Sequence, residues 1–350
     1  MAEILILGAG AMGSAFCFPA ADAGNSVRLV GTHLDRAWIR SVRETGVHPK
    51  LRTKLPEQVI PFTHDQLSEA LRPTCDLIVI GVSSAGIAWA VEQLAPLVNG
   101  TTPILLLTKG LQARANTLQI LPESVRDDLA LRGIENVPVA AVAGPCIASE
   151  LAARRDTSVI VGSSGAALLA SLVRLLSAPY YHVRPSTDMV GIEVCAALKN
   201  FYALAVGYAA GALARDGQAE NGALMHNLAA GLFTQALIEM TQLVNFLGGA
   251  QASVMGLAGA GDLYVTCQAG RNSRMGGLLG RGLRYSEAKT RHMSEETVEG
   301  ADLAFVIAPA LDRLFAQGRL DQKMFPLATA IIGAVCQDLP IEIPWAKLYS

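Results

Sequence analysis

The sequence has little charge and few aromatic side chains. Charged residues make up 17% of the 350 positions and aromatic residues 5%, whereas 51% are hydrophobic. A disordered chain shows the opposite balance, so the composition predicts a folded protein with a large core. The 28 Lys and Arg residues against 30 Asp and Glu residues give a formal net charge of -2. This balance excludes a broad basic surface for nucleic acid or anionic membranes, but not a small local cluster of cations.

Cysteine is sparse as well, and its spacing is not that of a metal site. The six cysteines are scattered, without a C-x-x-C pair, at positions 17, 75, 146, 195, 267 and 336. We therefore expect no metal site, and reduced, buried thiols in a cytoplasmic protein. No basic and then apolar segment opens the chain, so we expect no signal peptide. The apolar stretch 201–214 is shorter than a bilayer span, which favours a buried core helix and no membrane span.

Short apolar runs and helical patterns alternate in the first half of the chain. The runs of strand type occupy residues 3–7, 26–30, 59–62, 77–80, 104–107, 137–142 and 159–161. Helical patterns occupy residues 11–23, 84–97 and 166–176. Continuous apolar strands flanked by helices predict a parallel sheet that is covered on both faces. The expected fold is therefore an α/β Rossmann-type N-terminal domain.

The pattern changes near residue 188. Apolar residues recur at helical spacing over 190–246, 301–314 and 327–336, which predicts an all-α C-terminal domain. We place the dinucleotide-binding domain at 1–187 and a helical substrate and catalytic domain at 188–350. The glycine-rich piece 256–282 is expected to be the longest irregular stretch, and loops of that length are usually functional. The large apolar helical domain indicates a homodimer, although burial within one chain gives the same pattern.

A dinucleotide fingerprint stands at the start of the chain. The spacing G-x-G-x-x-G runs from Gly8 through Gly10 to Gly13, with Ala11 and Met12 between the last two glycines. The first glycine permits the tight turn, the second lets the backbone approach a pyrophosphate, and the third lets the helix pack on the strand. A glycine-rich turn without a ligand is the alternative. The context of strand, loop and helix favours the cofactor.

The end of the second strand bears on the choice between NAD and NADP. NAD binders usually carry an acid about 20 residues after the last glycine. The nearest acid here is Asp35, beside Arg36. His33 and Arg36 suit a 2′-phosphate, which Thr32 can hydrogen-bond, whereas Asp35 suits a ribose hydroxyl. We expect NAD or NADP with NADP slightly favoured, and a solvated strand end is the alternative.

Cations stand in three further segments. Lys109 directly follows the strand run 104–107, where ligands of doubly wound sheets lie, although a surface lysine would also fit. Lys199 lies inside an apolar helical run, where a partly desolvated ammonium suits proton transfer. A snorkelling lysine is equally compatible with its position. Arg271 follows a glycine-rich segment that contains Asp262, which suggests an anion clamp and a partner for Lys199.

Several of these segments together carry a resemblance to a known family. The most specific are Ala197-Leu198-Lys199-Asn200, Gly259–Leu263 with Thr266-Cys267, Arg271-Asn272 and Val298-Glu299-Gly300. In this order and at these distances, they resemble the soluble, bacterial-type NAD(P)-dependent sn-glycerol-3-phosphate dehydrogenases. The resemblance covers nearly the whole chain. It implies reversible reduction of dihydroxyacetone phosphate to sn-glycerol 3-phosphate with NAD(P)H, which feeds glycerophospholipid synthesis.

The resemblance also implies roles for individual residues. Lys199 would be the general acid/base, Asp262 its electrostatic partner and Lys109 a second cation near the carbonyl and the cofactor. Arg271 and Asn272 would hold the substrate phosphate. The positions expected to contact substrate are Lys109, Gly144, Cys146, Lys199, Asn200, Asp262, Thr266, Gly270, Arg271 and Asn272. The positions expected to contact cofactor include two from the end of the second strand, Thr32 and His33. The full set is Gly8, Gly10, Ala11, Met12, Gly13, Thr32, His33, Lys109, Ala148, Arg271, Val298 and Glu299.

The chain departs from the family pattern in three places. Gly270 stands where the family usually has a serine, Gln235 where it has an arginine, and the stretch 214–225 looks longer than usual. These departures leave open a related dehydrogenase of another small phosphorylated or carboxylated hydroxy compound. A non-catalytic dinucleotide-binding module is a further alternative. It would need neither Lys199 nor Arg271, so their presence argues against it.

Overall fold

The computed structural model describes residues 1–71, 75–114, 117–217, 219–268 and 270–349. The chain divides into two compact units, the first made of 1–109 and 121–189 and the second of 110–120 and 190–350. The division of the chain at residue 187 stays a prediction. The compact units differ from it in one respect, because the segment 110–120 belongs to the second unit although it lies inside the first half of the sequence.

An eight-stranded sheet forms the centre of the first unit, in the order β12-β11-β10-β7-β6-β1-β2-β5. Its strands are β1 (Glu3–Leu7), β2 (Ser26–Val30), β5 (Val59–Phe62), β6 (Leu77–Ile80), β7 (Ile104–Leu106), β10 (Val139–Ala143), β11 (Thr157–Gly162) and β12 (Tyr181–Ser186). A small hairpin adds β3 (Val47–His48) and β4 (Thr53–Lys54). The seven predicted strand runs all coincide with strands of the large sheet.

The prediction of a parallel sheet is wrong at one pair, because β10 and β11 are antiparallel. An apolar run predicts that a strand is buried but does not predict the direction of the strand. The antiparallel direction of β11 therefore could not be predicted from the sequence. Strand β12 was also missed. Its residues alternate between buried and exposed, with polar His182 and Arg184 on the exposed side, so it lacks a continuous apolar run.

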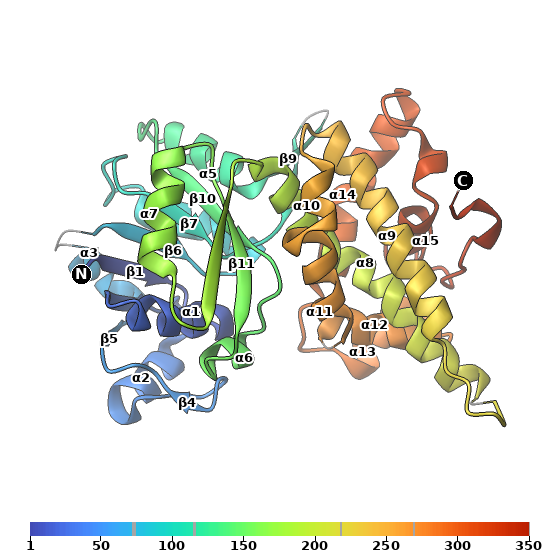
Figure 1. Ribbon diagram of the computed structural model, residues 1–350, viewed down its shortest axis with the longest axis horizontal. Coiled ribbons are helices and arrows are strands. Elements are labelled where there is room, and N and C mark those ends of the chain that lie inside the picture. The colour runs from blue at the N-terminus through green and yellow to red at the C-terminus, as the bar shows by residue number, and fades with distance from the viewer. Residues whose placement is uncertain (72–74, 115–116, 218, 269, 350) are drawn as a thin grey trace. The chain divides into compact units, whose positions relative to one another are not determined.

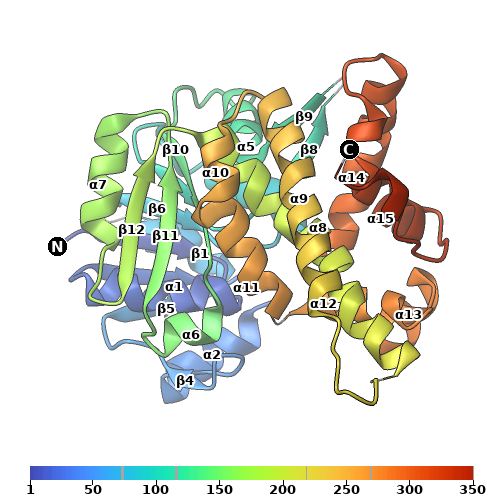
Figure 2. The same cartoon turned by 45° about the vertical axis from the view of Figure 1, so that its right-hand side comes forward.

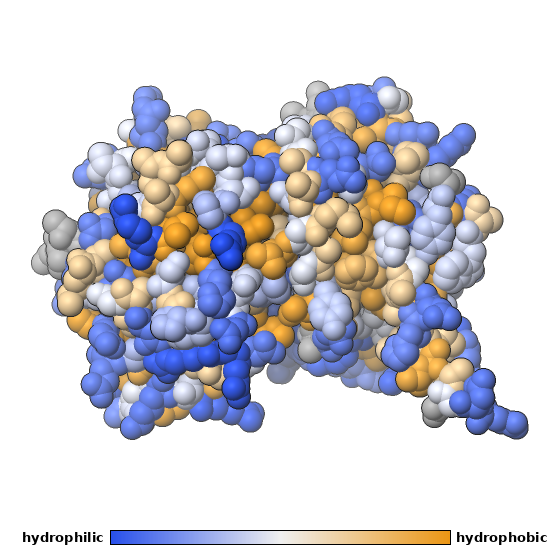
Figure 3. All heavy atoms as spheres, in the orientation of Figure 1, coloured by the Kyte–Doolittle hydropathy of each residue, from blue (hydrophilic) through white to orange (hydrophobic). Residues whose placement is uncertain are grey.

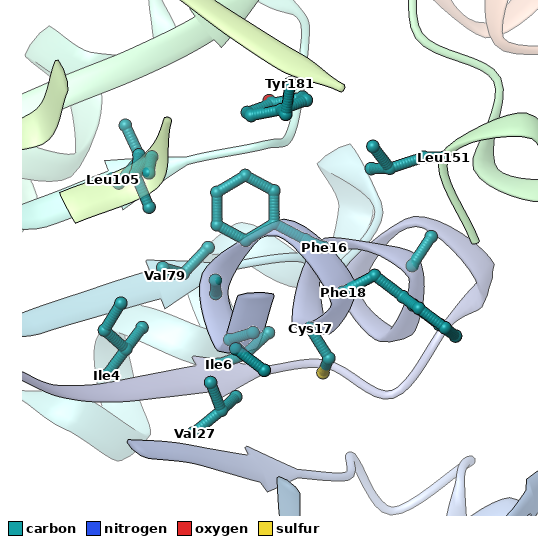
Figure 4. Packing of buried hydrophobic residues seen from close by; sticks show 14 of the residues in the cluster. Ile4, Ile6, Phe16, Cys17, Phe18, Val27, Val79, Leu105, Leu151 and Tyr181 are labelled. Carbon is teal, nitrogen blue, oxygen red and sulfur yellow. The ribbon is translucent and has the colours of Figure 1, made fainter. Parts of the chain in front are cut away.

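Helices cover both faces of this sheet (Figure 1). A separate apolar cluster lies between the sheet and the helices on each face. The helices of the unit are α1 (Ala11–Asp22), α2 (Arg36–Thr45), α3 (Leu67–Leu71), α4 (Ile87–Leu94), α5 (Leu121–Ala130), α6 (Ala148–Ala152) and α7 (Ala166–Leu176), with short 3₁₀ turns at His64–Gln66 and Ser84–Gly86. In the cluster under α1, Phe16 meets Tyr181 edge to face at 6.1 Å between ring centroids (Figure 4). This packing fixes the start of α1 against the sheet.

The second unit is helical apart from one hairpin, in the part of the chain that the structure describes (Figure 2). Its elements are β8 (Leu111–Arg114), β9 (Thr117–Ile120), α8 (Met189–Asp216), α9 (His226–Phe246), α10 (Gln251–Met255), a π-helical turn (Leu257–Gly261), α11 (Asp262–Gln268), α12 (Arg271–Gly280), α13 (Tyr285–His292), α14 (Glu299–Ala316), α15 (Pro326–Cys336) and 3₁₀ turns at Gln322–Met324 and Trp345–Lys347. The hairpin packs on α14. Helix α8 is long and apolar enough to cross a membrane, and 78% of its most apolar window is buried inside the protein.

The expectation of an irregular stretch over 256–282 is wrong. A π-helical turn, α11 and α12 occupy most of it. Several of its glycines lie where two helix backbones touch: a Cβ at Gly276 would lie 2.0 Å from the carbonyl oxygen of Leu204 in α8. Gly211 of α8 faces Gly277 of α12 in the same way, also at 2.0 Å from the carbonyl oxygen. These glycines therefore serve close helix packing, whereas composition alone suggested a loop.

Candidate active site

The glycine loop leads from β1 to α1 in the first unit. Gly8 has a φ of +116°, which side chains rarely tolerate, and its N–H donates to the Val30 carbonyl at 2.8 Å. A Cβ at Gly13 would lie 2.1 Å from the Gly8 carbonyl oxygen. Only glycine at both positions lets the chain turn and the helix begin this close to the loop. This is the local structure that a dinucleotide fingerprint requires.

Gly10 caps the N-terminus of α1 and faces open space. A Cβ placed on it would meet no atom within 4 Å. Ala11 and Met12 form the first turn of the helix, and no described side chain caps that turn. A helix N-terminus next to a glycine that leaves room for a ligand fits a pyrophosphate group. The loop therefore fits NAD or NADP.

The end of β2 contains one buried acid and two exposed basic side chains. Asp35 is 6% exposed, and its Oδ2 accepts hydrogen bonds from Thr32 N and Thr32 Oγ1, both at 2.9 Å, and from Ala9 N at 3.1 Å. Arg36 is exposed and lies 3.5 Å from Asp65. His33 is exposed as well. One carboxylate oxygen of Asp35 is thus engaged by protein donors, while Arg36 and His33 face solvent.

Further predicted positions follow neighbouring parallel strands of the same sheet. Lys109 comes after β7, and Gly144 after β10, which pairs with β7 in parallel. The carboxyl ends of β1, β7 and β10 meet at one edge of the sheet, so Lys109 and Gly144 share that edge with the glycine loop. Gly144 has a φ of +107°, which explains glycine there. Cys146 and Ala148 are half-buried, with Ala148 opening α6.

Lys199 and Asp262 form an ion pair inside the second unit. The Lys199 Nζ lies 2.5 Å from Asp262 Oδ1, and the two side chains are 12% and 1% exposed. This is the pairing that the sequence suggested. A carboxylate at this depth is costly unless a cation compensates it, which explains why the lysine is held in place. The Lys199 side chain is thus nearly, but not completely, buried.

A π-helical turn positions Asp262. The turn covers Leu257–Gly261, and the Gly261 N–H donates to the Gly256 carbonyl at 3.1 Å, five residues back. Such turns occur frequently at functional sites. Thr266 donates its hydroxyl to the Asp262 carbonyl at 2.7 Å, so in this structure it stabilises α11. Burial raises the pKa of the Cys267 thiol to about 12, with Lys199 acting weakly against the rise, so Cys267 is a neutral thiol near the pair.

Two asparagines connect the helices around Lys199. The Asn272 amide donates to Asn200 Oδ1 at 3.0 Å, and its own oxygen accepts the Gly300 N–H at 2.8 Å. Asn272 is 5% exposed. The amide therefore ties α8, α12 and α14 together at the residue next to Lys199. Its predicted role in a phosphate clamp stays a prediction.

Arg271 opens α12 and pairs with Glu299, which opens α14. The Arg271 side chain is 48% exposed, so it is accessible to an anion. Val298 precedes Glu299 and is buried. Gly270 has a φ of +129°, a conformation that disfavours the serine usual in the family. The first departure from the expected family pattern thus coincides with a backbone conformation that suits glycine.

One buried polar cluster was missed from the sequence. Glu239 of α9 accepts hydrogen bonds from Tyr202 at 3.0 Å, Gln235 at 2.9 Å, and the first N–H groups of α15, Leu327 at 2.7 Å and Ala328 at 2.8 Å. Burial raises the pKa of Glu239 to about 7. A glutamate inside an apolar helix was the available signal. Gln235, the second departure from the family pattern, is a neutral member of this cluster.

The fold and these residues define the class of nicotinamide-dependent oxidoreductases. Residues 3–168 match the family model described as the N-terminus of NAD-dependent glycerol-3-phosphate dehydrogenase, and residues 188–343 match the model of its C-terminus. The chain belongs to the NAD-dependent glycerol-3-phosphate dehydrogenase family.

Individual relatives agree with this assignment. An NADP(+)-dependent glycerol-3-phosphate dehydrogenase of Archaeoglobus fulgidus is 35% identical over 81% of this chain and 82% of its own. A glycerol-3-phosphate dehydrogenase [NAD(P)+] of Corynebacterium aurimucosum is 31% identical over 98% of this chain and 96% of its own. The crystal structure of glycerol-3-phosphate dehydrogenase from Coxiella burnetii superposes with a TM-score of 0.79, at 29% identity over 97% of this chain and 96% of that one.

These findings confirm the predicted family, the Rossmann-type domain followed by a helical part, and an NAD(P)-dependent enzyme. The roles of individual residues stay predictions. In the described part of the chain, the structure brings Lys199 together with Asp262, Asn200 with Asn272, and Arg271 with Glu299. It also places Gly8, Lys109 and Gly144 at one edge of the sheet.

Proposed function

We propose that this chain reduces dihydroxyacetone phosphate reversibly to sn-glycerol 3-phosphate with NADH or NADPH. The observation that carries the proposal is the Lys199–Asp262 pair, a nearly buried ammonium at 2.5 Å from a carboxylate. The carboxylate holds the ammonium in one place, and a positioned ammonium of this kind can donate a proton to a carbonyl oxygen. The family of the chain and its glycine loop support the same reaction.

In this proposal, each residue has a defined task. When bound, the reduced nicotinamide supplies a hydride to C2 of the substrate. Lys199 Nζ gives its proton to the C2 oxygen and regains one from solvent, while Asp262 orients the ammonium. Arg271 binds the substrate phosphate, since guanidinium groups bind such anions through paired hydrogen bonds. Lys109 stabilises negative charge on the carbonyl oxygen.

The strand end after β2 supports a preference for NADP. Arg36 and His33 are exposed, and the acid beside them in the sequence, Asp35, has an oxygen engaged by Thr32 and Ala9. A 2′-phosphate would gain a charge-assisted hydrogen bond from Arg36, worth on the order of 1.5–3 kcal/mol. We expect Arg36→Ala to raise the KM for NADPH about tenfold and to leave that for NADH nearly unchanged. Arg40→Ala, on the same helix and also exposed, is the matched control.

A substrate panel tests the reaction itself. We would measure NADH and NADPH oxidation with dihydroxyacetone phosphate, dihydroxyacetone, glyceraldehyde 3-phosphate and several keto acids. The proposal predicts that dihydroxyacetone phosphate is turned over with the highest kcat/KM, and that its unphosphorylated form is a poor substrate. Absence of turnover of dihydroxyacetone phosphate would contradict the proposal, and turnover of another compound of the panel would point to a related dehydrogenase.

The cellular setting is also proposed. The product supplies the glycerol backbone of phospholipids, so we propose a role in their synthesis. All six cysteines are free, which suits a reducing cytoplasm. The face of the second unit seen in Figure 3 displays apolar surface. Two large side chains of this unit, Met255 and Tyr264, are 62% and 60% exposed. A homodimer would cover such surface, and light scattering coupled to gel filtration would measure its mass.

A further inference from the structure

Two side chains outside the fingerprint hold its second residue. The Ala9 N–H donates to Asp35 Oδ2 at 3.1 Å, and the Ala9 carbonyl lies 2.9 Å from His48 Nε2. Ala9 is fully buried between Gly8 and Gly10. Both hydrogen-bonding groups of this residue are therefore taken up by side chains, which come from the end of β2 and from β3.

The hydrogen bonds of His48 determine which of its nitrogens carries the proton. The Leu51 N–H lies 3.3 Å from His48 Nδ1 and can only donate, so Nδ1 must accept. The Ala9 carbonyl can only accept, so Nε2 must carry the hydrogen. The neutral ring with its proton on Nε2 satisfies both partners at once. The ring is fully buried and packs against Trp38 at 5.7 Å between centroids.

We propose that Asp35 and His48 are positioning residues that set the conformation of the dinucleotide loop, and thereby cofactor affinity, by holding the Ala9 backbone from both sides. The inference rests on the proposed binding of NAD(P) at Gly8–Gly13. The loop has no side chains beyond Cβ that could fix it from within until Met12. Its backbone must nevertheless be preorganised, because ordering it on binding would reduce affinity.

The same geometry predicts sensitivity to acid. Protonation of His48 would place a hydrogen on Nδ1. Two N–H groups would then face each other, and the hydrogen bond from Leu51 would be lost. Burial lowers the pKa of His48, while its bond to Ala9 and the nearby Asp35 oppose that effect and Lys50 adds to it. Asp35 is the acid that faces the ring from β2, and Lys50 is the cation from the β3–β4 hairpin. We expect cofactor affinity to fall as the pH drops and the ring takes up a proton.

Two amide variants of His48 separate its two contacts. The Gln side chain can place an N–H where Nε2 lies, so His48→Gln should keep the bond to Ala9. The Asn side chain reaches only as far as Nδ1, so His48→Asn should keep the Leu51 contact and lose Ala9. The Kd for NADPH and NADH would be measured by fluorescence for the full chain, together with Tm, kcat and KM. His182→Gln, on the edge strand β12 of the large sheet, is a control for a histidine that has no contact with Ala9.

The expected result is a selective loss of cofactor affinity. His48→Asn should raise the cofactor Kd about tenfold, the size of one lost hydrogen bond, with kcat nearly unchanged, and His48→Gln should stay within about threefold of wild type. In His48→Gln, cofactor affinity should no longer fall as the pH drops, in contrast to the fall expected of the wild type. Equal affinity in both amide variants, or a change in Tm without a change in Kd, would overturn the proposal. Wild-type protein that binds neither cofactor would instead refute the proposed function.

Discussion

Glycine has opposite uses in the two units of this protein. In the first unit, Gly8 provides a backbone angle of +116° that shapes a ligand loop. In the second, Gly211 and Gly276 lie inside regular helices and let their backbones touch. Glycine content alone therefore does not distinguish a ligand-binding loop from a closely packed helix.

The units also differ in the groups that they bring to the reaction. The first unit presents backbone groups, namely the loop and the N-terminus of α1, together with the Lys109 side chain. The second presents side chains, with Lys199 and Asp262 buried together and Arg271 more exposed. We therefore expect changes at Lys199 and Asp262 to impair the chemistry without affecting cofactor binding.

The largest effect is expected from Lys199→Ala. Loss of a general acid typically lowers kcat by about 10²–10⁴-fold, whereas the cofactor Kd should not change. Stopped-flow fluorescence and steady-state kinetics would measure the two quantities. Because the variant leaves Asp262 as an uncompensated buried charge, Lys199→Ala/Asp262→Asn serves as a control for stability. Wild-type turnover in either protein would remove Lys199 from the proton-transfer role.

Two glycines of α12 test whether the close approach of α8 and α12 requires glycine. A methyl group at Gly276 would overlap the Leu204 carbonyl, so Gly276→Ala should lower the free energy of unfolding by about 3 kcal/mol or more. At the adjacent Gly277 the nearest atom to a new Cβ is 3.8 Å away. Gly277→Ala should therefore be neutral or up to about 1 kcal/mol more stable, because alanine favours a helix. Urea titrations that show equal stability for both variants would contradict the packing argument.

Arg271→Ala should chiefly impair binding of the substrate phosphate. We expect the KM for dihydroxyacetone phosphate to rise about 10- to 100-fold, the size of lost hydrogen bonds to a charged group. The weak turnover of dihydroxyacetone should change little. Arg274→Ala removes a comparably exposed arginine that also pairs with a glutamate, and it should leave the KM unaltered. The same rise in KM for both variants would point to general charge instead of a specific clamp.

A smaller effect is expected on the pH dependence of stability, through the titration of Glu239. Its pKa of about 7 in the folded protein lies above the ordinary value of 4.5, so the folded state retains a proton that the unfolded chain releases. Stability should consequently fall as the pH rises from about 4.5 to 7, by roughly 1 kcal/mol per unit. Glu239→Gln should reduce this slope in thermal melts, while the contribution of His48 is common to both proteins. Parallel curves for the two proteins would rule out Glu239 as the source.

Much of the first unit could be predicted because its signals are local. Apolar runs and the spacing of Gly8, Gly10 and Gly13 identified strands, loop and helix. The partners of these elements were less accessible: His48 lies 39 positions from Ala9, and Glu239 lies 88 from Leu327. The direction of β11 and the helical state of 256–282 depend on neighbours in space. Composition cannot report such contacts.

The central claim is direct reduction at C2 of dihydroxyacetone phosphate by this chain. The measurement that tests it uses NADPH carrying deuterium at the transferred C4 position, in a single turnover with excess enzyme. We expect one deuterium at C2 of sn-glycerol 3-phosphate, detected by mass spectrometry and NMR, and almost none in the same time with Lys199→Ala. Oxidation of NADPH without deuterium at C2, or no product from the wild type, would contradict it.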